Sequence, residues 1–474
     1  MPLILPGNVG SATAATGFNV ANSLRFRGAT ADTYLTATFG ATPTLATKNT
    51  ISLWFKRSKF DANQQLYTTN SNAANIIFNR SGASTGPTAA FYTNSGQLLG
   101  PKLYRDTSAW MHFVFAFDST QATAANRFKV YINGVLETTF NNTAYPAKDE
   151  ASQLGVNGEE IQIGTRSNYD RIFDGYMAET AFVDGQTLDA TSFGEFDSDS
   201  GIWKPIDISG LTFGNNGFYL EYKGTGTSAN SSGIGADTSG NDLHFAINAF
   251  TAADQTVDTC TNNFCTVNPL DNYHQQATYS EGNTKITFKG ASSVYAWSTG
   301  TFGMANGKWY WETKATSAGN HNVYGISGRL SVAHNQSLGR YTDTYGYYNA
   351  NGNYTNAATD GSYREVSFSG GNVTWGTNAI IGIALDLDSG TNTVKFYKNN
   401  ALVGTVDIIA PSSGFYYPAW NQFDNQAEVC QPNFGNPSYA ISSGNTDGNG
   451  YGNFEYAPPS GYFALCTKNL AEFG

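Results

Sequence analysis

The chain has 474 residues, enough for two or three domains that each bury a core. It contains 51 Gly, 28 Tyr and 31 Phe but only 4 Met, and 13% of its residues are charged, a composition that favours strands and turns over helices. The net charge of -11, without a stripe of Lys or Arg, argues against a phosphate-binding surface, so we expect no nucleic acid partner.

The N-terminal residues 1–7 are apolar over a short stretch, and no basic residue precedes Arg25. These features do not match a secretory signal, and no later apolar run reaches the length of a membrane span. We therefore expect synthesis in a cytoplasm and no insertion into a membrane. Four cysteines match no disulfide framework or zinc pattern, so we expect free thiols.

Strand-like segments rich in β-branched and aromatic residues begin near residue 23 and recur about every 8 to 12 residues, a spacing typical of β-sandwiches. In residues 110–118 alternate positions are apolar, and the segment ends on an Asp. Residues 128–140 follow as a hairpin whose tip is Asn133-Gly134, residue types that supply the positive φ of a tight turn.

The same pattern recurs about 270 residues later. Residues 379–388 alternate and end on an Asp, and residues 393–404 form a hairpin with Asn399-Asn400 at its tip. Because each such strand can line one sandwich core, the repetition predicts an all-β protein of two tandem antiparallel sandwiches.

The first expected sandwich contains five fragments in a fixed order: Ile51-Ser-Leu-Trp-Phe-Lys56, Trp110-Met-His-Phe-Val-Phe-Ala-Phe-Asp118, Val130-Tyr-Ile-Asn-Gly134, Ile161-Gln-Ile-Gly164 and Asp174-Gly-Tyr-Met-Ala-Glu179. With these fragments, about residues 20–222 resemble a laminin-G-like, concanavalin A-like jelly roll.

The last third of the chain contains, in order, fragments that include Gly307-Lys-Trp-Tyr-Trp-Glu-Thr313, Val323-Tyr-Gly-Ile326, Tyr345-Gly-Tyr347, Pro432-Asn-Phe-Gly435 and Pro458-Pro-Ser-Gly-Tyr-Phe463. With these fragments, residues 276–474 resemble a SPRY domain, which is also a concanavalin A-like jelly roll. We therefore predict a first domain over residues 1–222, an irregular connector over 223–275 and a second domain over 276–474.

The expected connector is rich in Gly, Ser, Thr and Asp. Phe245, Phe250, Phe264 and Leu270 give it apolar anchors, so we expect an ordered segment laid on a domain surface. Its Asp-rich turns match no EF-hand spacing. We expect no cofactor, and a structural calcium ion stays open as an alternative.

The pairing of these two domains, joined by Gly235-Ala-Asp-Thr-Ser-Gly-Asn-Asp242 and Asn262-Asn-Phe-Cys-Thr-Val-Asn-Pro-Leu-Asp271, resembles structural proteins of tailed bacteriophages. The resemblance implies a virion surface protein, such as a tail or head fibre or a decoration protein, made in the host cytoplasm. Its implied partners are other virion proteins and host-surface glycans, and we expect a homo-oligomer.

Catalytic patterns are absent from the sequence. The string Glu195-Phe-Asp-Ser-Asp-Ser200 has Ser where the E-x-D-x-x-E pattern of concanavalin A-like glucanases has its second Glu. The histidines show no metal-ligand spacing, and no Ser lies in a Gly-x-Ser-x-Gly elbow. We therefore predict no catalytic residues, no metal ligands and no enzymatic activity.

Aromatic residues between 330 and 375 are interleaved with Asn, Asp, Gly and Thr, a mixture suited to binding a glycan or a peptide. The candidate ligand-binding residues are Tyr341, Tyr348, Tyr354 and Trp375. Packing in the core or sheet is the favoured alternative for Tyr345 and Tyr347. We expect Tyr354 and Trp375, next to turns, to be exposed, and recognition to map to loops and not to sheet faces.

Three function classes follow. The leading one is a virion surface protein whose lectin-like domains contact host glycans or proteins. The second is a purely structural virion component whose sandwiches pack against neighbouring subunits. The third and weakest is a glycan depolymerase.

Overall fold

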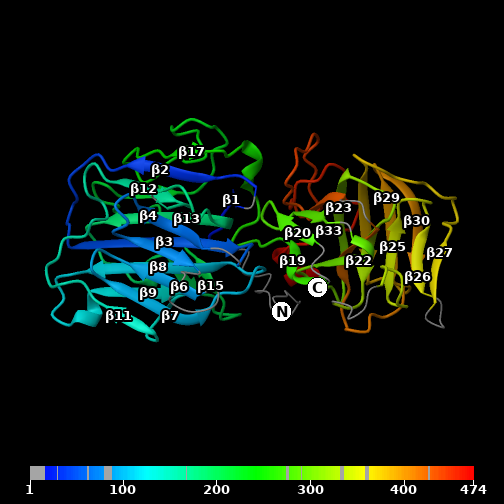
Figure 1. Cartoon of the computed structure of the whole chain (residues 1–474), viewed down its shortest axis with the longest axis horizontal. Helices are drawn as coiled ribbons and strands as arrows, with labels where there is room; N and C mark the ends of the chain where they lie inside the picture. Colours follow the sequence, from blue (N-terminus) through cyan, green and yellow to red (C-terminus); the bar gives the residue numbers. More distant parts are fainter. Residues whose placement is uncertain are drawn as a thin grey trace. The chain divides into compact units, whose positions relative to one another are not determined.

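The computed structural model describes residues 17–28, 30–60, 63–78, 88–166, 168–273, 277–289, 291–330, 336–357, 362–424 and 428–474. The N-terminal residues 1–7 lie outside this part of the chain. The described residues form two compact units, which we call the first sandwich (17–261) and the second sandwich (262–474) (Figure 1). Each unit pairs two antiparallel sheets, so the expected all-β fold of two tandem sandwiches is confirmed.

In the first sandwich, the β3 sheet has the order β10-β9-β8-β3-β13-β1-β18, with β16 paired to β13. Its strands are β1 Ser23–Arg27, β3 Lys48–Arg57, β8 Met111–Asp118, β9 Phe128–Ile132, β10 Val135–Leu136, β13 Asp174–Asp184, β16 Phe218–Leu220 and β18 Gln255–Thr256. The facing β4 sheet has the order β11-β7-β6-β5-β4-β12-β2-β17. Its strands are β2 Tyr34–Thr38, β4 Gln64–Thr69, β5 Asn75–Phe78, β6 Thr88–Tyr92, β7 Gln97–Leu103, β11 Asn142–Ala144, β12 Glu160–Ile163 and β17 Ala246–Asn248. A separate pair joins β14 Gly194–Phe196 to β15 Trp203–Pro205.

The alternation in β8 builds the first core. Phe113 contacts Phe91 of the β4 sheet, with ring centroids 5.3 Å apart. The hairpin after β9 turns at Asn133 (φ 47°) and Gly134 (φ 81°), as the sequence predicts. The other face of β8 carries His112, whose Nδ1 accepts a hydrogen bond from Trp203 and whose Nε2 lies 2.8 Å from the Ser52 hydroxyl. Burial lowers the pKa of His112 to about 3, so this histidine is a neutral, satisfied residue of the sheet.

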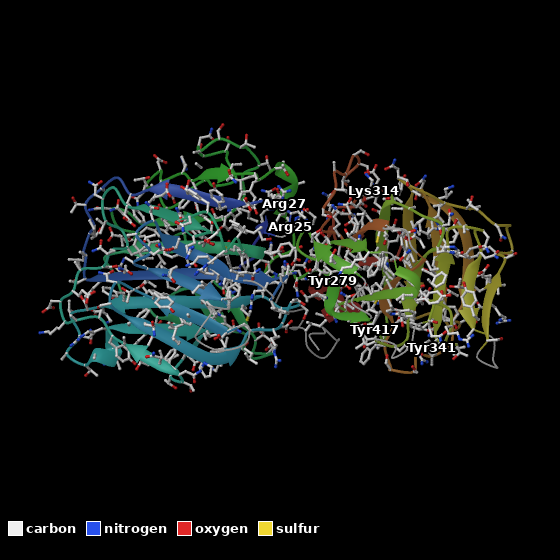
Figure 2. The ribbon with its side chains drawn as sticks, in the orientation of Figure 1. Arg25, Arg27, Tyr279, Lys314, Tyr341 and Tyr417 are labelled. Atoms are coloured by element: carbon white, nitrogen blue, oxygen red, sulfur yellow. The ribbon has the colours of Figure 1, made fainter. Side chains whose placement is uncertain are left out.

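The segment 223–261 is an integral part of the first sandwich. Phe245 and Phe250 are buried in its core, whereas Leu270, in the second unit, is 43% exposed. Asp254 pairs with the guanidinium groups of Arg25 and Arg27, which Figure 2 labels. The change from one unit to the other falls between residues 261 and 262.

In the second sandwich, the β24 sheet has the order β19-β22-β31-β24-β25-β26-β27. Its strands are β19 Val267–Tyr273, β22 Ala291–Gly300, β24 Asn322–Ser327, β25 Thr344–Tyr348, β26 Tyr354–Ala357, β27 Tyr363–Val366 and β31 Tyr417–Asp424. The β23 sheet has the order β20-β21-β32-β23-β28-β29-β30, with β33 parallel to β23. Its strands are β20 Ala277–Ser280, β21 Lys285–Phe288, β23 Lys308–Ser317, β28 Ile380–Asp386, β29 Thr393–Lys398, β30 Ala401–Asp407, β32 Glu428–Asn433 and β33 Phe463–Ala464.

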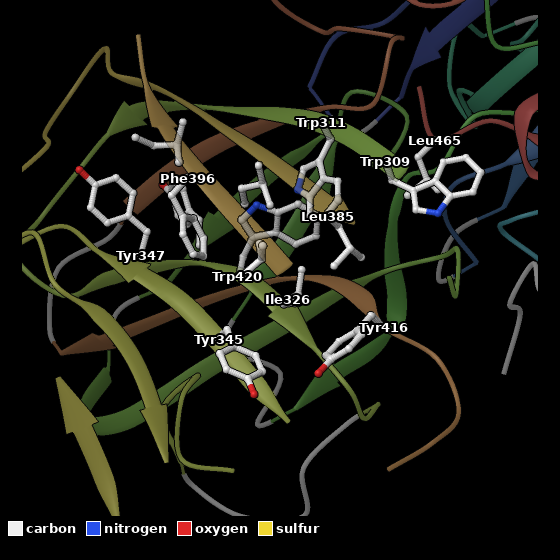
Figure 3. Close-up of a cluster of buried hydrophobic side chains, with 14 of the residues drawn as sticks. Trp309, Trp311, Ile326, Tyr345, Tyr347, Leu385, Phe396, Tyr416, Trp420 and Leu465 are labelled. Carbon is white, nitrogen blue, oxygen red and sulfur yellow. The ribbon is translucent and has the colours of Figure 1, made fainter. Parts of the chain in front are cut away.

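Aromatic side chains fill the second core. Figure 3 shows Trp311 and Leu385 of the β23 sheet gathered with Ile326 and Trp420 of the β24 sheet. The hairpin between β29 and β30 turns through Asn399 and Asn400, at φ 46° and 71°. Helix α1 (Thr467–Phe473) lies at the C-terminal end. Within the ranges given above, no helix has both the length and the apolar character needed to cross a membrane.

Candidate functional site

The face of the β24 sheet that is turned away from the β23 sheet carries a group of aromatic side chains. Strand alternation explains why they share a face: Ala296 and Trp420 are in the core, so their neighbours Tyr295 and Asn421 point outward. Val323 pairs in register with Asn421 on one side and with Tyr348 on the other, so these residues are also on the outer face.

We call Tyr295, His321, Tyr341, Tyr348 and Phe423 the aromatic face. Tyr295 stacks on Phe423, with ring centroids 4.2 Å apart and planes at 27°. His321 meets Phe423 edge-on at 5.8 Å and lies parallel to Tyr348 at 6.0 Å. The Tyr348 hydroxyl is 2.6 Å from Nδ1 of His321. All five side chains are partly exposed, so the rings lie at the surface of the domain. The contacts of Tyr295, His321, Tyr348 and Phe423 with one another orient these rings.

Polar groups border these rings. Burial and the nearby Glu365 carboxylate raise the pKa of Tyr348 to about 12, so its hydroxyl keeps its proton at neutral pH. Burial and Glu365 also raise the pKa of Tyr295. Glu365 is exposed on β27, where Nδ2 of Asn351 donates a hydrogen bond to it. The rings are therefore accompanied by a hydroxyl, an amide and a carboxylate that can bind sugar hydroxyls.

A segment between β24 and β25 packs across the same face. Leu338 is buried against a cluster of Trp297, Val323 and Ala419. Its backbone N–H donates a hydrogen bond to Oδ1 of Asn421 (3.2 Å). This contact fixes the segment that carries Tyr341.

Tyr341, labelled in Figure 2, packs on the same cluster as Tyr348. The guanidinium of Arg329 lies 4.2 Å from the centroid of the Tyr341 ring. Arg329 is itself held by two hydrogen bonds to Oδ1 of Asp343 (2.9 and 2.6 Å). The ring of Tyr341 is therefore oriented from one side by a fixed cation.

Residues 28–191 match the model of the concanavalin A-like lectin/glucanases superfamily (Laminin_G_3), and residues 308–437 match the SPRY domain model. The chain contains a concanavalin A-like domain and a SPRY domain. Both expected domain resemblances are thereby confirmed, and the aromatic face belongs to the SPRY domain.

No curated protein matches the chain. Among solved structures, the SPRY domain of human HERC1 is 16% identical, with 35% of this chain and 96% of that chain covered and a TM-score of 0.28. A carbohydrate-binding protein from Bacteroides ovatus, described as putative, is 14% identical, with 49% and 60% covered and a TM-score of 0.36. The heptameric SAP-like pentraxin from Limulus polyphemus is 12% identical, with 36% and 80% covered and a TM-score of 0.27.

The four candidate residues predicted from the sequence divide between the two faces of the SPRY domain's β24 sheet. Tyr341 and Tyr348 lie together on the outer face. Tyr354 packs against Phe368 on the core side, at 5.3 Å between ring centroids. Trp375 is 5% exposed and lies in the core, 4.6 Å from Tyr324. The expectation that Trp375 is exposed is therefore wrong, because the segment after β27 folds its indole back between the sheets.

Three members of the aromatic face were not predicted. Tyr295, His321 and Phe423 lie far apart in the sequence and meet only because β22, β31 and β24 are neighbours in the sheet. The one local signal was the Tyr-Ala-Trp alternation at 295–297, which marks a strand with aromatic residues on one side and a small residue on the other. The sequence predicts that recognition maps to loops. The structure instead places these aromatic side chains on a face of the β24 sheet.

The loop that carries His321 is tied to a buried carboxyl group of the SPRY domain. Oε1 of Glu428 accepts a hydrogen bond from the Gly319 N–H at 2.6 Å, and the carbonyl of Gly319 accepts one from Nδ2 of Asn349. Glu428 is 1% exposed, and its Oε2 has no hydrogen-bond partner among the described residues. Burial raises the pKa of Glu428 to about 8, so the carboxyl group is neutral at mildly acidic pH.

Glu428→Gln should remove a pH-dependent loss of stability. Because the pKa of Glu428 is raised in the folded state, its protonated carboxyl group contributes fully to the stability of the fold below about pH 4.5, the ordinary pKa of a glutamate. This stabilising contribution is lost as the pH rises toward 8. The free energy of unfolding changes by about 1.4 kcal/mol for each pH unit over which the two states differ by one proton. The melting temperature of the variant relative to the parent should therefore increase between pH 5 and pH 9.

Thermal melts of both proteins across this range provide the measurement. Asp407→Asn, which changes an exposed carboxylate at the end of β30, is the matched control and should show no such trend. A constant difference between Glu428→Gln and the parent at every pH would contradict the assignment.

The string that most resembles a glucanase motif is a surface turn. Glu195 pairs with Lys204 at 3.3 Å, and its side chain is 58% exposed. Asp197 accepts hydrogen bonds from the backbone and hydroxyl of Ser200, which lower its pKa to about 2. The residues that the structure describes contain no group of three or more His, Cys, Asp or Glu placed to hold a metal ion.

Proposed function

We propose that this protein is a carbohydrate-binding protein that holds a sugar ring against the aromatic face of its SPRY domain. The observation that carries the proposal is the fixed set of half-exposed rings from neighbouring strands, led by the Tyr295–Phe423 stack at 4.2 Å. Such rings pack on the C–H faces of sugars, and the polar groups of Tyr348 and Glu365 match ring hydroxyls. The lectin-containing superfamily matched by residues 28–191 supports the same class of function.

We further propose that the protein acts at the surface of a bacteriophage virion, where it contacts host glycans. The support is the resemblance of the domain pair and its joining segment to phage structural proteins. Mass spectrometry of purified particles, with antibody labelling in electron micrographs, tests this setting. Absence of the protein from particles that are washed free of lysate would contradict it.

Tyr295→Ala should weaken glycan binding about tenfold, because an aromatic contact of this kind contributes around 1 to 2 kcal/mol. Binding is measured on a glycan array and then by calorimetry with the best ligand. Tyr397→Ala is the matched control, since Tyr397 is also half-buried and lies in β29 of the opposite sheet. The control should bind like the parent, and both variants should keep the fold.

Four results would change the proposal. Equal binding by the parent and Tyr295→Ala would remove the aromatic face as the site. Binding to a host-surface protein, with none to glycans, would make the ligand a polypeptide. Release of reducing ends during the incubation would contradict the proposed lack of enzymatic activity, and loss of binding in EDTA would favour the calcium alternative.

A purely structural role is the second candidate function. It is favoured by the end of the β3 sheet, where β10 is the last strand and exposes Val135 (60%) and Leu136 (39%). An apolar edge strand of this kind can pair with another chain. Sedimentation of the purified protein tests the expected homo-oligomer, and a monomer at all concentrations would count against this candidate.

A further inference from the structure

A groove of about 550 Å³ lies in the concanavalin A-like domain, on the outer face of the β3 sheet. Register explains its floor: Ala116 of β8 lies between Thr50 of β3 and Lys129 of β9, and its methyl group is the shortest side chain of the row. Residues 118–126 form one wall and residues 185–189 form the other.

Both walls are fixed by hydrogen bonds within the domain. In the first, the Arg127 guanidinium donates to the carbonyls of Gln121 and Ala122. In the second, the Thr187 hydroxyl donates to the carbonyl of Phe117, and the Leu188 N–H donates to the Thr50 hydroxyl. A ligand would thus meet a groove that is already shaped, which lowers the entropic cost of binding.

The charged groups in the groove differ in whether they already have a partner within the domain. Asp118 accepts hydrogen bonds from Thr120 and Gln121 and lies 3.4 Å from the ammonium of Lys48, so this pair is internally satisfied. Lys129 is half-exposed, and its ammonium has no hydrogen-bond or ion-pair partner in the described part of the chain.

Tyr131 lies next to Lys129 on the outer face of β9. Burial and the neighbouring Asp189 raise the pKa of Tyr131, so its hydroxyl remains a donor. Tyr131 packs against a hydrophobic cluster that includes Val114 and Trp203, and it also lines the groove. The groove thus offers the unpaired ammonium of Lys129, together with the hydroxyl of Tyr131 and the carboxylate of Asp189.

We propose that this groove binds a sugar that carries a carboxylate, such as a uronic acid residue of an acidic polysaccharide. The sugar carboxylate pairs with the Lys129 ammonium, and the ring hydroxyls bind Tyr131 and Asp189. A neutral sugar would leave the cation without a counter-charge. A small inorganic anion would fill only a fraction of 550 Å³. The site is in a different domain from the aromatic face and does not depend on it.

The test uses the full chain and calorimetric titration with tetramers of galacturonate and glucuronate, each paired with its carboxyl-reduced counterpart. At least one acidic tetramer should bind about tenfold or more tightly than its reduced form, as expected for a hydrogen bond to a charged group. The difference should shrink as salt is raised. Equal binding of acidic and reduced forms, or no binding of either acid, overturns the proposal.

Lys129→Gln should abolish this preference for the acid, and Lys129→Arg should retain it. Lys148→Gln is the control for net charge, because Lys148 is a surface lysine of the same domain outside the groove. If Lys129→Gln and Lys148→Gln behave alike, the acid is not held in this groove.

Discussion

Trp375→Ala should lower the free energy of unfolding of the SPRY domain by about 3–5 kcal/mol, the usual cost of removing a large buried aromatic side chain. The indole is 5% exposed and packs against Tyr324 and Tyr347, at 4.6 and 6.0 Å between ring centroids. Its removal leaves a cavity between two sheets whose strands cannot close over it.

Trp375→Phe separates packing from polarity. Nε1 of Trp375 is buried with no hydrogen-bond partner among the described residues, so phenylalanine keeps part of the ring and removes an unsatisfied donor. This variant should be clearly more stable than Trp375→Ala. Chemical denaturation followed by fluorescence and circular dichroism measures both, and Tyr348→Ala on the outer face is the comparison.

The two outcomes distinguish a core role from a ligand-binding role. A core role predicts that Trp375→Ala unfolds early and that Tyr348→Ala stays folded with weaker glycan binding. A stable Trp375→Ala protein that has lost its ligand would instead show that the indole reaches the surface in solution.

The strands and hairpins could be predicted from the sequence because their signals are local. Alternation in 110–118 and 379–388, with Asn at the hairpin tips, depends on neighbouring residues only, and the structure has these strands and turns. The two domain resemblances could be recognised for the same reason, because they are carried by short strand fragments that follow one another in a fixed order.

The faces of the sheet could not be predicted in the same way. Tyr347 and Tyr348 are adjacent, yet one lies in the core and the other on the aromatic face, and only the pairing with β24 decides which. Trp375 follows a turn-rich stretch that is polar in composition, so its burial depends on a tertiary contact with Tyr324. Sites built from several strands depend on long-range register, which one sequence does not encode locally.

The segment 223–261 also depends on long-range contacts that its local sequence does not reveal. Its composition predicts an irregular connector, but Asp258 within it is fully buried and pairs with Lys56 of β3, whose side chain is 1% exposed. Oδ1 of Asp258 also accepts a hydrogen bond from Nε1 of Trp110 (3.1 Å). The ring of Tyr176 lies 4.8 Å from the Lys56 ammonium. The pair thus fastens the segment to the face of the β3 sheet.

Asp258→Asn should destabilise the concanavalin A-like domain by about 3–5 kcal/mol, because it leaves the Lys56 ammonium buried without its counter-charge. Lys56→Met should destabilise the domain by a similar amount, because it leaves the Asp258 carboxylate buried without its counter-charge. The double variant should lose much less than the sum of the two, since no buried charge remains unpaired. Asp170→Asn, which breaks the exposed Arg166–Asp170 pair, should cost at most about 1 kcal/mol.

Denaturant unfolding of the four variants provides the cycle. Additive losses from Asp258→Asn and Lys56→Met would contradict a direct coupling between the two charges. A strong coupling has a structural consequence: a domain cut at residue 222 would lack the carboxylate that neutralises Lys56. The concanavalin A-like domain should therefore fold only when its sequence extends to residue 261, with Asp258 included.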